Sequence, residues 1–457
     1  MSSHCLGGRR MHYDVIVIGG GPGGYTAANK AAANGLHTAL FEKNKVGGTC
    51  LNRGCIPMKS LIESARILNG CRNGEMYGIR SDNVSFDYEA VNRRRDEVVT
   101  TLRSGVERSL KANKVDMICG QAKLKKDRSV LCGDTVYTAD HIIIAAGSIP
   151  AIPPIEGAEL AIDSDRILET DYRIPGSMII IGGGVIGTEI ASALSAFGCQ
   201  ITILEMAEHL LPTMDKDIGQ RLASYFRKKQ ISAVCSASVR SIRKTEDGLS
   251  VSYQDKNGTE QSVTGEEVLI ATGRKANLEG LFEEETDLKV FRGIVSDENG
   301  QTDLPGVYVI GDARSGNIQL AHVAEAQGEN IVDHILGREL TNDMSVIPSG
   351  VYTDPEIATV GCREADLKQE NVEYKVRKYL TGANGKCLIE NSESGFVKVI
   401  TVDDVIVGGQ IIAPHATELI GELAIAVEKK MTVKQFAEIV HPHPTISEML
   451  WNVVKQK

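Results

Sequence analysis

Short runs of hydrophobic residues, separated by glycine-rich turns and alanine-rich stretches, form the pattern of the first part of the chain. Residues 13–18 (YDVIVI) predict a buried strand, residues 19–24 (GGGPGG) a turn, and residues 25–34 a helix. A second hydrophobic run, at residues 37–41, ends at the acidic residue Glu42. A strand, a glycine turn, a helix and a second strand that ends in an acidic residue make up a βαβ unit of the kind that binds dinucleotides.

The same arrangement occurs a second time further along the chain. A strand, a glycine turn (GGGVIG), a helix and a strand that ends in an acidic residue are predicted at residues 178–181, 182–187, 188–197, 200–204 and Glu205. In both copies the first glycine and the acidic residue are 23 positions apart, from 19 to 42 and from 182 to 205. One glycine motif is a weak signal. Two copies with matched context indicate two dinucleotide sites.

The remaining pattern completes an α/β architecture. Strand-like runs that end in small residues occur at residues 141–147 (HIIIAAG), 268–273 (VLIATG) and 306–312 (GVYVIGD). Beyond Pro348 the pattern changes, and it predicts antiparallel strands and then helices at residues 372–379, 395–402, 405–412, 416–430 and 433–439. We therefore expect two Rossmann-like dinucleotide-binding domains, a central domain and an α+β C-terminal domain.

Composition and charge exclude two classes of protein. The chain has 457 residues, which implies about two to four domains. It carries 60 acidic and 50 basic residues, for a net charge of −10, and lacks a basic block. This balance argues against binding nucleic acid by neutralising its phosphates. No apolar run reaches the roughly 18 residues of a membrane helix, so we expect no membrane association.

Ten cysteines are scattered along the chain, and only Cys50 and Cys55 are close neighbours. This distribution is typical of a reducing cytosol with one special pair rather than of a disulfide scaffold. The start of the chain shows no apolar segment of the secretory type, so we expect a cytoplasmic protein. The C-x4-C spacing differs from that of the usual zinc motifs, and we expect no metal site.

The spacing of Cys50 and Cys55 makes a demand on the backbone. On a regular helix, residues five positions apart are separated by about 7.5 Å along the axis, whereas the Cα atoms of a disulfide lie within about 7 Å. The segment must therefore be distorted if the pair bonds, and Gly54 permits this. A thiolate near a helix N-terminus and a cation such as Lys59 would have a lowered pKa. The alternative is two unrelated buried thiols.

Each glycine turn lets backbone N–H groups approach a pyrophosphate at a helix N-terminus. Glu42 and Glu205 would accept hydrogen bonds from a ribose 2′-OH, whereas a 2′-phosphate would be repelled. Glu205 is followed by Met206, Ala207 and Glu208 without a nearby arginine, so the second site should prefer NAD over NADP. Two sites imply two dinucleotides, and FAD plus NAD is the simplest pair that accounts for them.

A further motif, HPHPTISE, lies near the C-terminus and places Glu448 five residues after His443. A carboxylate that holds and polarises an imidazole is a general-base arrangement. On its own the motif is weak evidence, because most such histidines are solvated or structural. The general-base interpretation gains support because the chain also contains the pair Cys50 and Cys55.

With GGTCLNRGCIPMK at residues 47–59, and with GGGPGG, GGGVIG, ATGR, GVYVIGDA and HPHPTISE in order, the chain resembles flavin disulfide reductases over nearly its whole length. Its motifs are most similar to those of the members that oxidise dihydrolipoyl groups carried by acyltransferases or by H-protein-type carriers. The resemblance implies a homodimer in which residues 1–148 bind FAD, 149–275 bind NAD, 276–347 complete the FAD site and 348–457 form the dimer interface.

The resemblance also implies roles for individual residues. It places FAD against Gly19, Gly21, Gly24, Glu42, Lys59, Ala122, Gly147, Asp312 and Ala321. It places NAD against Gly182, Gly184, Val185, Ile186, Gly187, Glu205, Val239 and Gly273. Cys55 would face the flavin and Cys50 would exchange with substrate, while Lys59 would pair with Glu189 near the flavin. His443, polarised by Glu448, would act on the active site of the other subunit.

Two other interpretations stay open at this point. One is a different FAD-dependent disulfide or metal reductase on the same scaffold, such as a glutathione, mycothiol or mercuric reductase. The other is a non-enzymatic NADH-bound scaffold protein, which would require an idle cysteine pair. Turnover of a dithiol with NAD+ separates these alternatives from the main interpretation.

Overall fold

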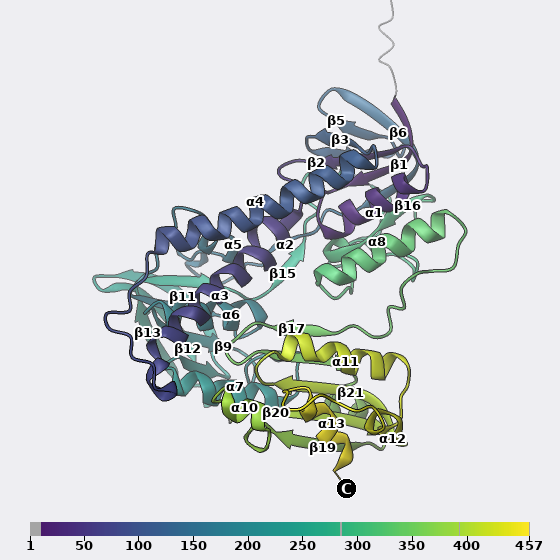
Figure 1. Cartoon of the computed structure of the whole chain (residues 1–457). Helices are drawn as coiled ribbons and strands as arrows, with labels where there is room; N and C mark the ends of the chain where they lie inside the picture. The colour runs from purple at the N-terminus through teal and green to yellow at the C-terminus, as the bar shows by residue number, and fades with distance from the viewer. Residues whose placement is uncertain (1–10, 284–285, 393, 457) are drawn as a thin grey trace, which may run out of the picture. The chain divides into compact units, whose positions relative to one another are not determined.

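We describe a computed structural model of the chain over residues 11–283, 286–392 and 394–456 (Figure 1). It divides into two compact units. The first combines Met1–Ser60, Glu89–Ala151 and Arg274–Met344, and the second combines Leu61–Tyr88, Ile152–Gly273 and Ser345–Lys457. The boundaries of the four domains expected from the sequence remain predictions.

The first unit is built on a seven-stranded sheet of order β3-β2-β1-β6-β5-β4, with β16 paired to β6. Its strands are β1 (Met11–Ile18), β2 (Thr38–Glu42), β3 (Asp116–Cys119), β4 (Ala122–Leu124), β5 (Val130–Cys132), β6 (Thr135–Ile144) and β16 (Val307–Val309). The pairs of β1 with β2 and β6, of β2 with β3 and of β6 with β16 are parallel, whereas β4–β5 and β5–β6 are antiparallel. The predicted βαβ unit is therefore present.

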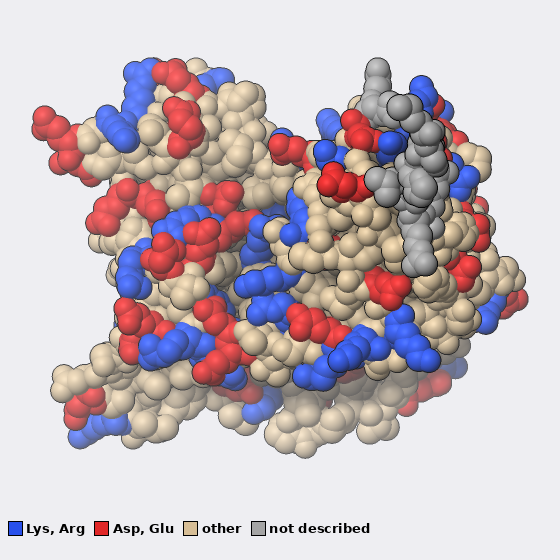
Figure 2. Space-filling model, turned by 90° about the horizontal axis from the view of Figure 1, so that it is seen from above, with Lys and Arg blue, Asp and Glu red and all other residues tan. Residues whose placement is uncertain are grey.

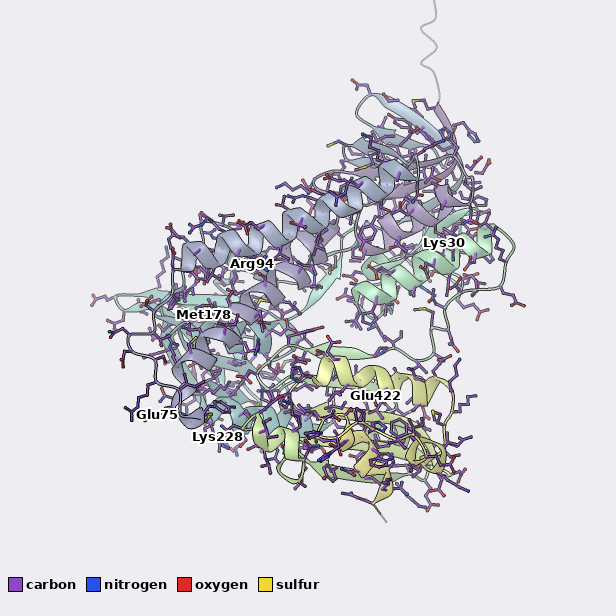
Figure 3. The ribbon with its side chains drawn as sticks, viewed as in Figure 1. Lys30, Glu75, Arg94, Met178, Lys228 and Glu422 are labelled. Carbon is purple, nitrogen blue, oxygen red and sulfur yellow. The ribbon has the colours of Figure 1, made fainter. Side chains whose placement is uncertain are left out.

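Two helices cover one face of this sheet, α1 (Pro22–Ala33) and α8 (Ala321–Ile335). Their small and aliphatic side chains, among them Ala28 and Val332, form one buried cluster with Val17 of β1. Lys30 of α1, labelled in Figure 3, forms an ion pair of 2.7 Å with Asp333 of α8. The helices α2 (Gly48–Arg53) and α4 (Tyr88–Ala112) and a small antiparallel pair, β7 (Ser148–Pro150) with β15 (Arg274–Ala276), also belong to this unit. The helix α3 (Cys55–Arg72) begins in the first unit and continues into the second.

The second unit contains the second βαβ unit. A four-stranded parallel sheet has the order β10-β9-β8-β14, and a three-stranded antiparallel sheet packs against it through Ile181, Ile242 and Val251. The elements are β8 (Ser177–Ile181), α6 (Val185–Ala196), β9 (Gln200–Glu205), α7 (Lys216–Lys228), β10 (Ser232–Cys235), β11 (Ser238–Thr245), β12 (Gly248–Gln254), β13 (Glu260–Gly265) and β14 (Glu267–Ile270).

The C-terminal part of the second unit is α+β, as the sequence pattern predicts. Its antiparallel sheet consists of β17 (Ser349–Val351), β18 (Ile357–Gly361), β21 (Val405–Ile412), β20 (Phe396–Val402) and β19 (Lys375–Leu380), in that order. The helices α11 (Ala416–Glu428), α12 (Val433–Ala437) and α13 (Glu448–Lys455) bury Leu423, Phe436 and Leu450 against it. Shorter helices in this part are α9 (Glu364–Gln369), α10 (Gly385–Ile389) and η4 (Thr381–Ala383). Elsewhere, the second unit contains α5 (Ser164–Ile167), η1 (Gly74–Tyr77) and η2 (Ala158–Leu160), and the first contains η3 (Gly311–Ala313).

The starts predicted for the two helices that follow the glycine turns are wrong by three residues. The helix α1 begins at Pro22 instead of residue 25, and α6 begins at Val185 instead of residue 188. Proline fits the first turn of a helix because the N–H that it lacks would have no partner there. The last glycines of each turn are therefore part of the helix.

Acidic and basic side chains are interspersed on the face of the molecule shown in Figure 2. None of the described helices combines the length and the apolar character required of a membrane-spanning segment.

Candidate redox and dinucleotide-binding sites

In the first glycine turn, close backbone contacts leave no room for side chains at Gly19 and Gly24. Gly19 has a φ of 108°, and a Cβ atom on it would lie 2.3 Å from the Ala145 carbonyl oxygen. A Cβ atom on Gly24 would lie 1.9 Å from the Gly19 carbonyl oxygen. Gly21 is the N-cap residue of α1, and no side chain caps this end of the helix. The turn therefore presents uncapped backbone N–H groups, which suit a phosphate group.

The second turn repeats these contacts. Gly182 has a φ of 114°, and its Cβ atom would lie 2.5 Å from the Ala271 carbonyl oxygen. A Cβ atom on Gly187 would lie 2.0 Å from the Gly182 carbonyl oxygen. Gly184 is the N-cap residue of α6, again without a side-chain cap. Val185 and Ile186 form the first turn of α6. Both turns thus have the close backbone packing and the uncapped helix N-terminus that are typical of dinucleotide-binding turns.

The acidic residue at the end of each second strand is bonded to its own turn. The Glu42 carboxylate accepts hydrogen bonds of 2.8 Å from the N–H groups of Gly20 and Asn44. The Glu205 carboxylate accepts hydrogen bonds of 2.6 Å from the N–H groups of Gly183 and Ala207. Each carboxylate oxygen keeps a further lone pair, so both side chains can still accept a bond from a ribose hydroxyl.

The two turns differ in what lies over them. The Cα atom of Gly48, the first residue of α2, is 3.8 Å from the position of a Cβ atom on Gly21. At the matching position of the second turn, Gly184, no described residue lies within 4 Å of such an atom. The helix α2 therefore packs on the first turn. On the second turn the segment after β9 packs instead on Gly183, whose carbonyl accepts a 2.9 Å hydrogen bond from the Leu211 N–H.

The other residues expected near FAD occupy the same unit. Gly147 has a φ of 71° and follows β6. Asp312 lies on η3 and accepts a 2.6 Å hydrogen bond from the Ser148 hydroxyl. Ala122 is buried in β4, and Ala321 is the first residue of α8. Sequence reasoning missed Ser148, although it directly follows Gly147 at the start of β7.

Two further residues expected near NAD lie at the margins of the second βαβ unit. Gly273, with a φ of 113°, comes three residues after the end of β14. Val239 is the second residue of β11. The Ala237 N–H, just before this strand, donates a 2.8 Å hydrogen bond to the Glu205 carbonyl. The start of β11 therefore lies next to the end of β9.

The backbone between Cys50 and Cys55 is distorted, as their spacing requires. Cys50 lies in α2, which ends at Arg53, and Cys55 begins α3. Gly54 separates the helices with φ −145° and ψ −113°. A Cβ atom on Gly54 would lie 3.0 Å from the Thr49 carbonyl oxygen. The break lets the two side chains meet, since they share a hydrogen bond as thiols.

The lowered pKa predicted for this pair is wrong for Cys50 in its thiol form. The hydrogen bond with Cys55 raises the pKa of Cys50 well above its ordinary value, and burial and the negative charge of Glu325 raise it further. The positive charge of Lys59 acts in the opposite direction. Sequence reasoning considered the helix terminus and Lys59, but it could not see that a carboxylate 275 positions away in the chain faces Cys50.

Tyr25 and Glu325 are the other residues that sequence reasoning missed at this site. The Tyr25 hydroxyl donates a 3.0 Å hydrogen bond to Glu325 Oε1. Burial, together with Glu325, raises the pKa of Tyr25, and the Cys50 charge adds to this effect. Tyr25 immediately follows the first glycine turn, and Glu325 lies one helical turn after Ala321. Each residue is thus adjacent to a recognised motif, but their contact joins segments 300 positions apart.

The predicted pair of His443 and Glu448 is formed. His443 Nδ1 lies 3.0 Å from Glu448 Oε1, and the imidazole is 78% exposed. The Thr445 N–H, 3.0 Å from Glu448 Oε2, lowers the pKa of Glu448, while partial burial opposes it and His443 adds to the lowering. The carboxylate therefore holds one imidazole nitrogen and leaves Nε2 available to take a proton.

A second histidine–carboxylate contact lies close by in the chain. His441 Nε2 is 3.0 Å from Glu422 of α11, the residue labelled in Figure 3, and the His441 ring stacks on Trp451. His441 is buried, unlike His443. Of the two, only His443 therefore presents its ring to solvent.

The predicted pair of Lys59 and Glu189 joins residues of different units and stays a prediction. Within the second unit, Glu189 is buried in α6, and its Oε1 accepts a 3.0 Å hydrogen bond from the Tyr352 N–H. Within the first unit, the charge of Lys59 acts on Cys50.

One acidic group resembles a metal site, but it surrounds a lysine. The buried Lys398 Nζ lies 2.6 Å from Asp215, 2.9 Å from Asp217 and 3.0 Å from Glu364. These three carboxylates are the one group of potential metal ligands among the described residues. The Lys398 ammonium group occupies the place that a cation would take, and Lys378 forms a further ion pair with Asp217.

Comparison with known proteins identifies the family. Residues 13–328 match the pyridine nucleotide-disulphide oxidoreductase family, and residues 347–454 match its dimerisation domain. The chain is 37% identical over 460 residues to the dihydrolipoyl dehydrogenase of Bacillus subtilis (strain 168), and the match covers 96% of each chain. It is 36% identical to the dihydrolipoyl dehydrogenase of Chlamydia pneumoniae, with 96% of this chain and 95% of the relative covered.

A solved structure agrees with this. The flavoprotein disulfide reductase RclA of Escherichia coli, determined as a Cu(II) complex, superposes with a TM-score of 0.85 at 26% identity, covering 97% of this chain and 99% of RclA. Family membership supports the predicted FAD and NAD cofactors, and the dimerisation domain supports the predicted homodimer. With two glycine turns, a thiol pair and a match over most of its length, the chain belongs to the pyridine nucleotide-disulphide oxidoreductase family.

Proposed function

We propose that the protein oxidises carrier-bound dihydrolipoyl groups to lipoyl groups and reduces NAD+, the activity of a dihydrolipoyl dehydrogenase. The observation that carries the proposal is the thiol pair Cys50–Cys55, which meets across the break at Gly54 in the same unit as the first glycine turn. The full-length similarity to proteins named dihydrolipoyl dehydrogenase points to the dihydrolipoyl group as the substrate.

The residues proposed to hold FAD fit a dinucleotide. A Cβ atom on Gly24 or on Gly19 would collide with the backbone, so the turn keeps a close approach to the α1 terminus free of side chains. Glu42 would accept a hydrogen bond from the adenosine ribose, and Asp312 would accept one from the ribityl chain. In the second unit, the turn at residues 182–187 and Glu205 would hold NAD in the same way. Bound FAD supplies electron transfer from the dithiol to NAD+.

The chain's own residues would perform the proton and sulfur chemistry. In the oxidised enzyme Cys50 and Cys55 form a disulfide. His443 of the partner subunit, held by its own carboxylate, removes a proton from the dihydrolipoyl dithiol. The resulting thiolate attacks Cys50, which forms a mixed disulfide and releases the Cys55 thiolate. The second substrate sulfur displaces Cys50, which completes the lipoyl disulfide and leaves the reduced cysteine pair.

The wider assignments follow from the same proposal. The dihydrolipoyl groups would be carried by the acyltransferase of a 2-oxo acid dehydrogenase complex or by an H-protein-type carrier of a glycine cleavage system. The four segments 1–148, 149–275, 276–347 and 348–457 would bind FAD, bind NAD, complete the FAD site and form the dimer interface. The scattered cysteines suit a reducing cytoplasm.

Steady-state reduction of NAD+ by dihydrolipoamide, with the purified FAD-loaded protein, tests the proposal. Turnover of dihydrolipoamide well above that of other thiols is expected. Faster NADH-dependent or NADPH-dependent reduction of glutathione disulfide or of mercuric ion would instead identify another reductase on this scaffold. Bound NADH without turnover of any of these substrates would indicate a scaffold protein.

A further inference from the structure

The N-termini of three helices meet around Cys50 in the first unit. The Gly48 Cα atom at the start of α2 packs on Gly21, just before α1. A Cβ atom on Gly23, in the first turn of α1, would lie 2.7 Å from the Ala324 carbonyl oxygen in the first turn of α8. Cys50 follows Gly48 by two residues, and Glu325 follows Ala324. These contacts explain why the two side chains act on each other electrostatically.

The Glu325 carboxylate is held in place by Tyr25. The Tyr25 hydroxyl, on α1, donates a 3.0 Å hydrogen bond to Glu325 Oε1. Tyr25 also interacts electrostatically with Cys50, so the donor, the acceptor and the thiol lie in one group. The hydrogen bond from the phenol limits the rotamers that the Glu325 side chain can adopt. A negative charge is thereby fixed beside a half-buried thiol.

Two charges of opposite sign act on Cys50. Glu325 disfavours a negative charge on this sulfur, and Lys59 favours one. Any substrate that exchanges with Cys50 must bring one of its own sulfurs to the same place. A carboxylate close to that sulfur would meet the charge of Glu325 at partial burial, where charges are less screened than in water. An uncharged dithiol ring would meet no such repulsion.

We propose that Glu325, positioned by Tyr25, determines the charge selectivity of disulfide exchange at Cys50, disfavouring anionic disulfides and accepting uncharged ones. The proposal rests on the proposed function, in which Cys50 is the sulfur that meets the substrate, and it narrows the substrate class. Glu325 is thus a specificity-determining residue, and Tyr25 is a positioning residue.

Three small linear disulfides test this selectivity in the NADH-dependent direction. In this direction Cys50 attacks one substrate sulfur and releases a thiol, and Cys55 then displaces the second thiol as the Cys50–Cys55 disulfide forms. NADH supplies the two electrons, so that NADH, one proton and R–S–S–R give NAD+ and two R–SH. The probes are dithiodiglycolate, bis(2-hydroxyethyl) disulfide and cystamine, which carry two negative charges, no charge and two positive charges.

Glu325→Gln removes the charge and keeps a hydrogen-bond acceptor for Tyr25. We expect kcat/KM for dithiodiglycolate, relative to the uncharged disulfide, to rise about threefold to tenfold, and the preference for cystamine to fall by a similar factor. Glu329→Gln is the matched control. It removes one charge from the same helix, where Glu329 accepts a 2.7 Å hydrogen bond from Asn342, and it should leave the ratios unchanged. If Glu325→Gln leaves the kcat/KM ratios as unchanged as Glu329→Gln does, the proposal is overturned.

A measurement without turnover separates this proposal from the proposed function. The reduced, FAD-loaded protein is alkylated with neutral iodoacetamide or anionic iodoacetate, and labelling of Cys50 is followed by mass spectrometry. Glu325→Gln should lower the iodoacetamide-to-iodoacetate rate ratio several-fold, and Glu329→Gln should not. If the wild type fails to oxidise dihydrolipoamide, the proposed function fails. If it turns over and the alkylation ratio does not move, only the charge selectivity fails.

The wild-type protein alone gives an independent check, should Glu325→Gln not retain FAD. Raising the ionic strength screens charges, so the iodoacetamide-to-iodoacetate ratio at Cys50 should fall with added salt. A ratio that is the same at low and high salt would count against a fixed carboxylate beside this thiol.

Discussion

Glu205 Oε2 accepts a 2.6 Å hydrogen bond from the backbone N–H of Gly183, the middle glycine of the second turn. The acidic residue that is expected to bind a ribose therefore also fixes the turn that is expected to bind the pyrophosphate. Glu42 and Gly20 have the same relationship in the first turn, at 2.8 Å. Loss of either carboxylate should disturb both parts of a dinucleotide site at once.

Glu205→Leu is therefore expected to lower kcat/KM for NAD+ by about tenfold to a hundredfold, because a hydrogen bond to a charged group contributes about 1.5–3 kcal/mol. The flavin absorbance should be unchanged. Glu208→Leu, which removes an exposed ion pair with Lys216, is the control and should change kcat/KM less than threefold. Equal losses in the two variants would contradict the role of Glu205.

The two turns can be tested separately with the same substitution. In Gly24→Ala and Gly187→Ala, the added methyl group would lie about 2 Å from a carbonyl oxygen of its own turn. Gly24→Ala should purify without FAD. Gly187→Ala should keep FAD and lose NAD+ binding, as measured by NADH-dependent reduction of the bound flavin.

Gly70→Ala controls for a methyl group added to a helix, since Gly70 of α3 has no described atom within 4 Å of its Cβ position. It should keep both cofactors. Loss of FAD in Gly187→Ala, or retention of full activity in either turn variant, would show that the turns do not serve separate cofactors.

Cys50→Ser should abolish oxidation of dihydrolipoamide and leave a yellow, FAD-bound protein. The hydroxyl cannot exchange with a disulfide, while the FAD site does not depend on this side chain. Cys71→Ser removes an exposed thiol from α3 and should retain full turnover. Turnover by Cys50→Ser within tenfold of the wild type would refute the exchange role.

If each active site combines Cys50 of one subunit with His443 of the other, two inactive variants should restore activity when they form mixed dimers. Homodimers of His443→Ala and of Cys50→Ser should both be inactive, because each lacks one part of both sites. Mixed dimers should regain about a quarter to a half of the wild-type activity, since one of their two sites contains both residues. Mass spectrometry confirms heterodimer formation. Inactive heterodimers would place His443 and Cys50 of one site in the same chain.

The lowered pKa of Glu448 predicts a pH-dependent stability. A carboxyl group whose pKa falls on folding stabilises the protein above its unfolded pKa, near 4.5, and loses that contribution as the pH falls through the folded value. The unfolding midpoint of Glu448→Gln should thus lie below that of the wild type at pH 7, and the gap should close below pH 4.5. Glu438→Gln, an exposed control, should show no such trend. A gap that is constant with pH would contradict the prediction.

The parts of the site that the sequence predicted are those defined by local spacing. Gly19 and Gly182 require a positive φ, and Gly24 and Gly187 require close backbone contact, so each turn is encoded in six consecutive residues. The distortion between the cysteines followed from helix geometry and Gly54. These features depend on neighbours in the chain, which a single sequence displays.

The features that were missed depend on residues far apart in the chain. Tyr25 and Glu325 are 300 positions apart, and Ser148 and Asp312 are 164 apart. Such contacts arise from the parallel sheet, which brings the ends of distant strands and helices to one edge. The charge that Cys50 experiences therefore could not be predicted from its own segment, and the expected direction of its pKa shift was wrong.

The segment that follows each acidic residue is bonded back to the turn before it. The Gly47 N–H donates a 2.7 Å hydrogen bond to the Gly20 carbonyl, and the Leu211 N–H donates a 2.9 Å hydrogen bond to the Gly183 carbonyl. Together with the acidic side chain, this bond holds each turn in shape before a nucleotide binds. Little backbone freedom then has to be lost on binding, so more of the interaction energy contributes to affinity.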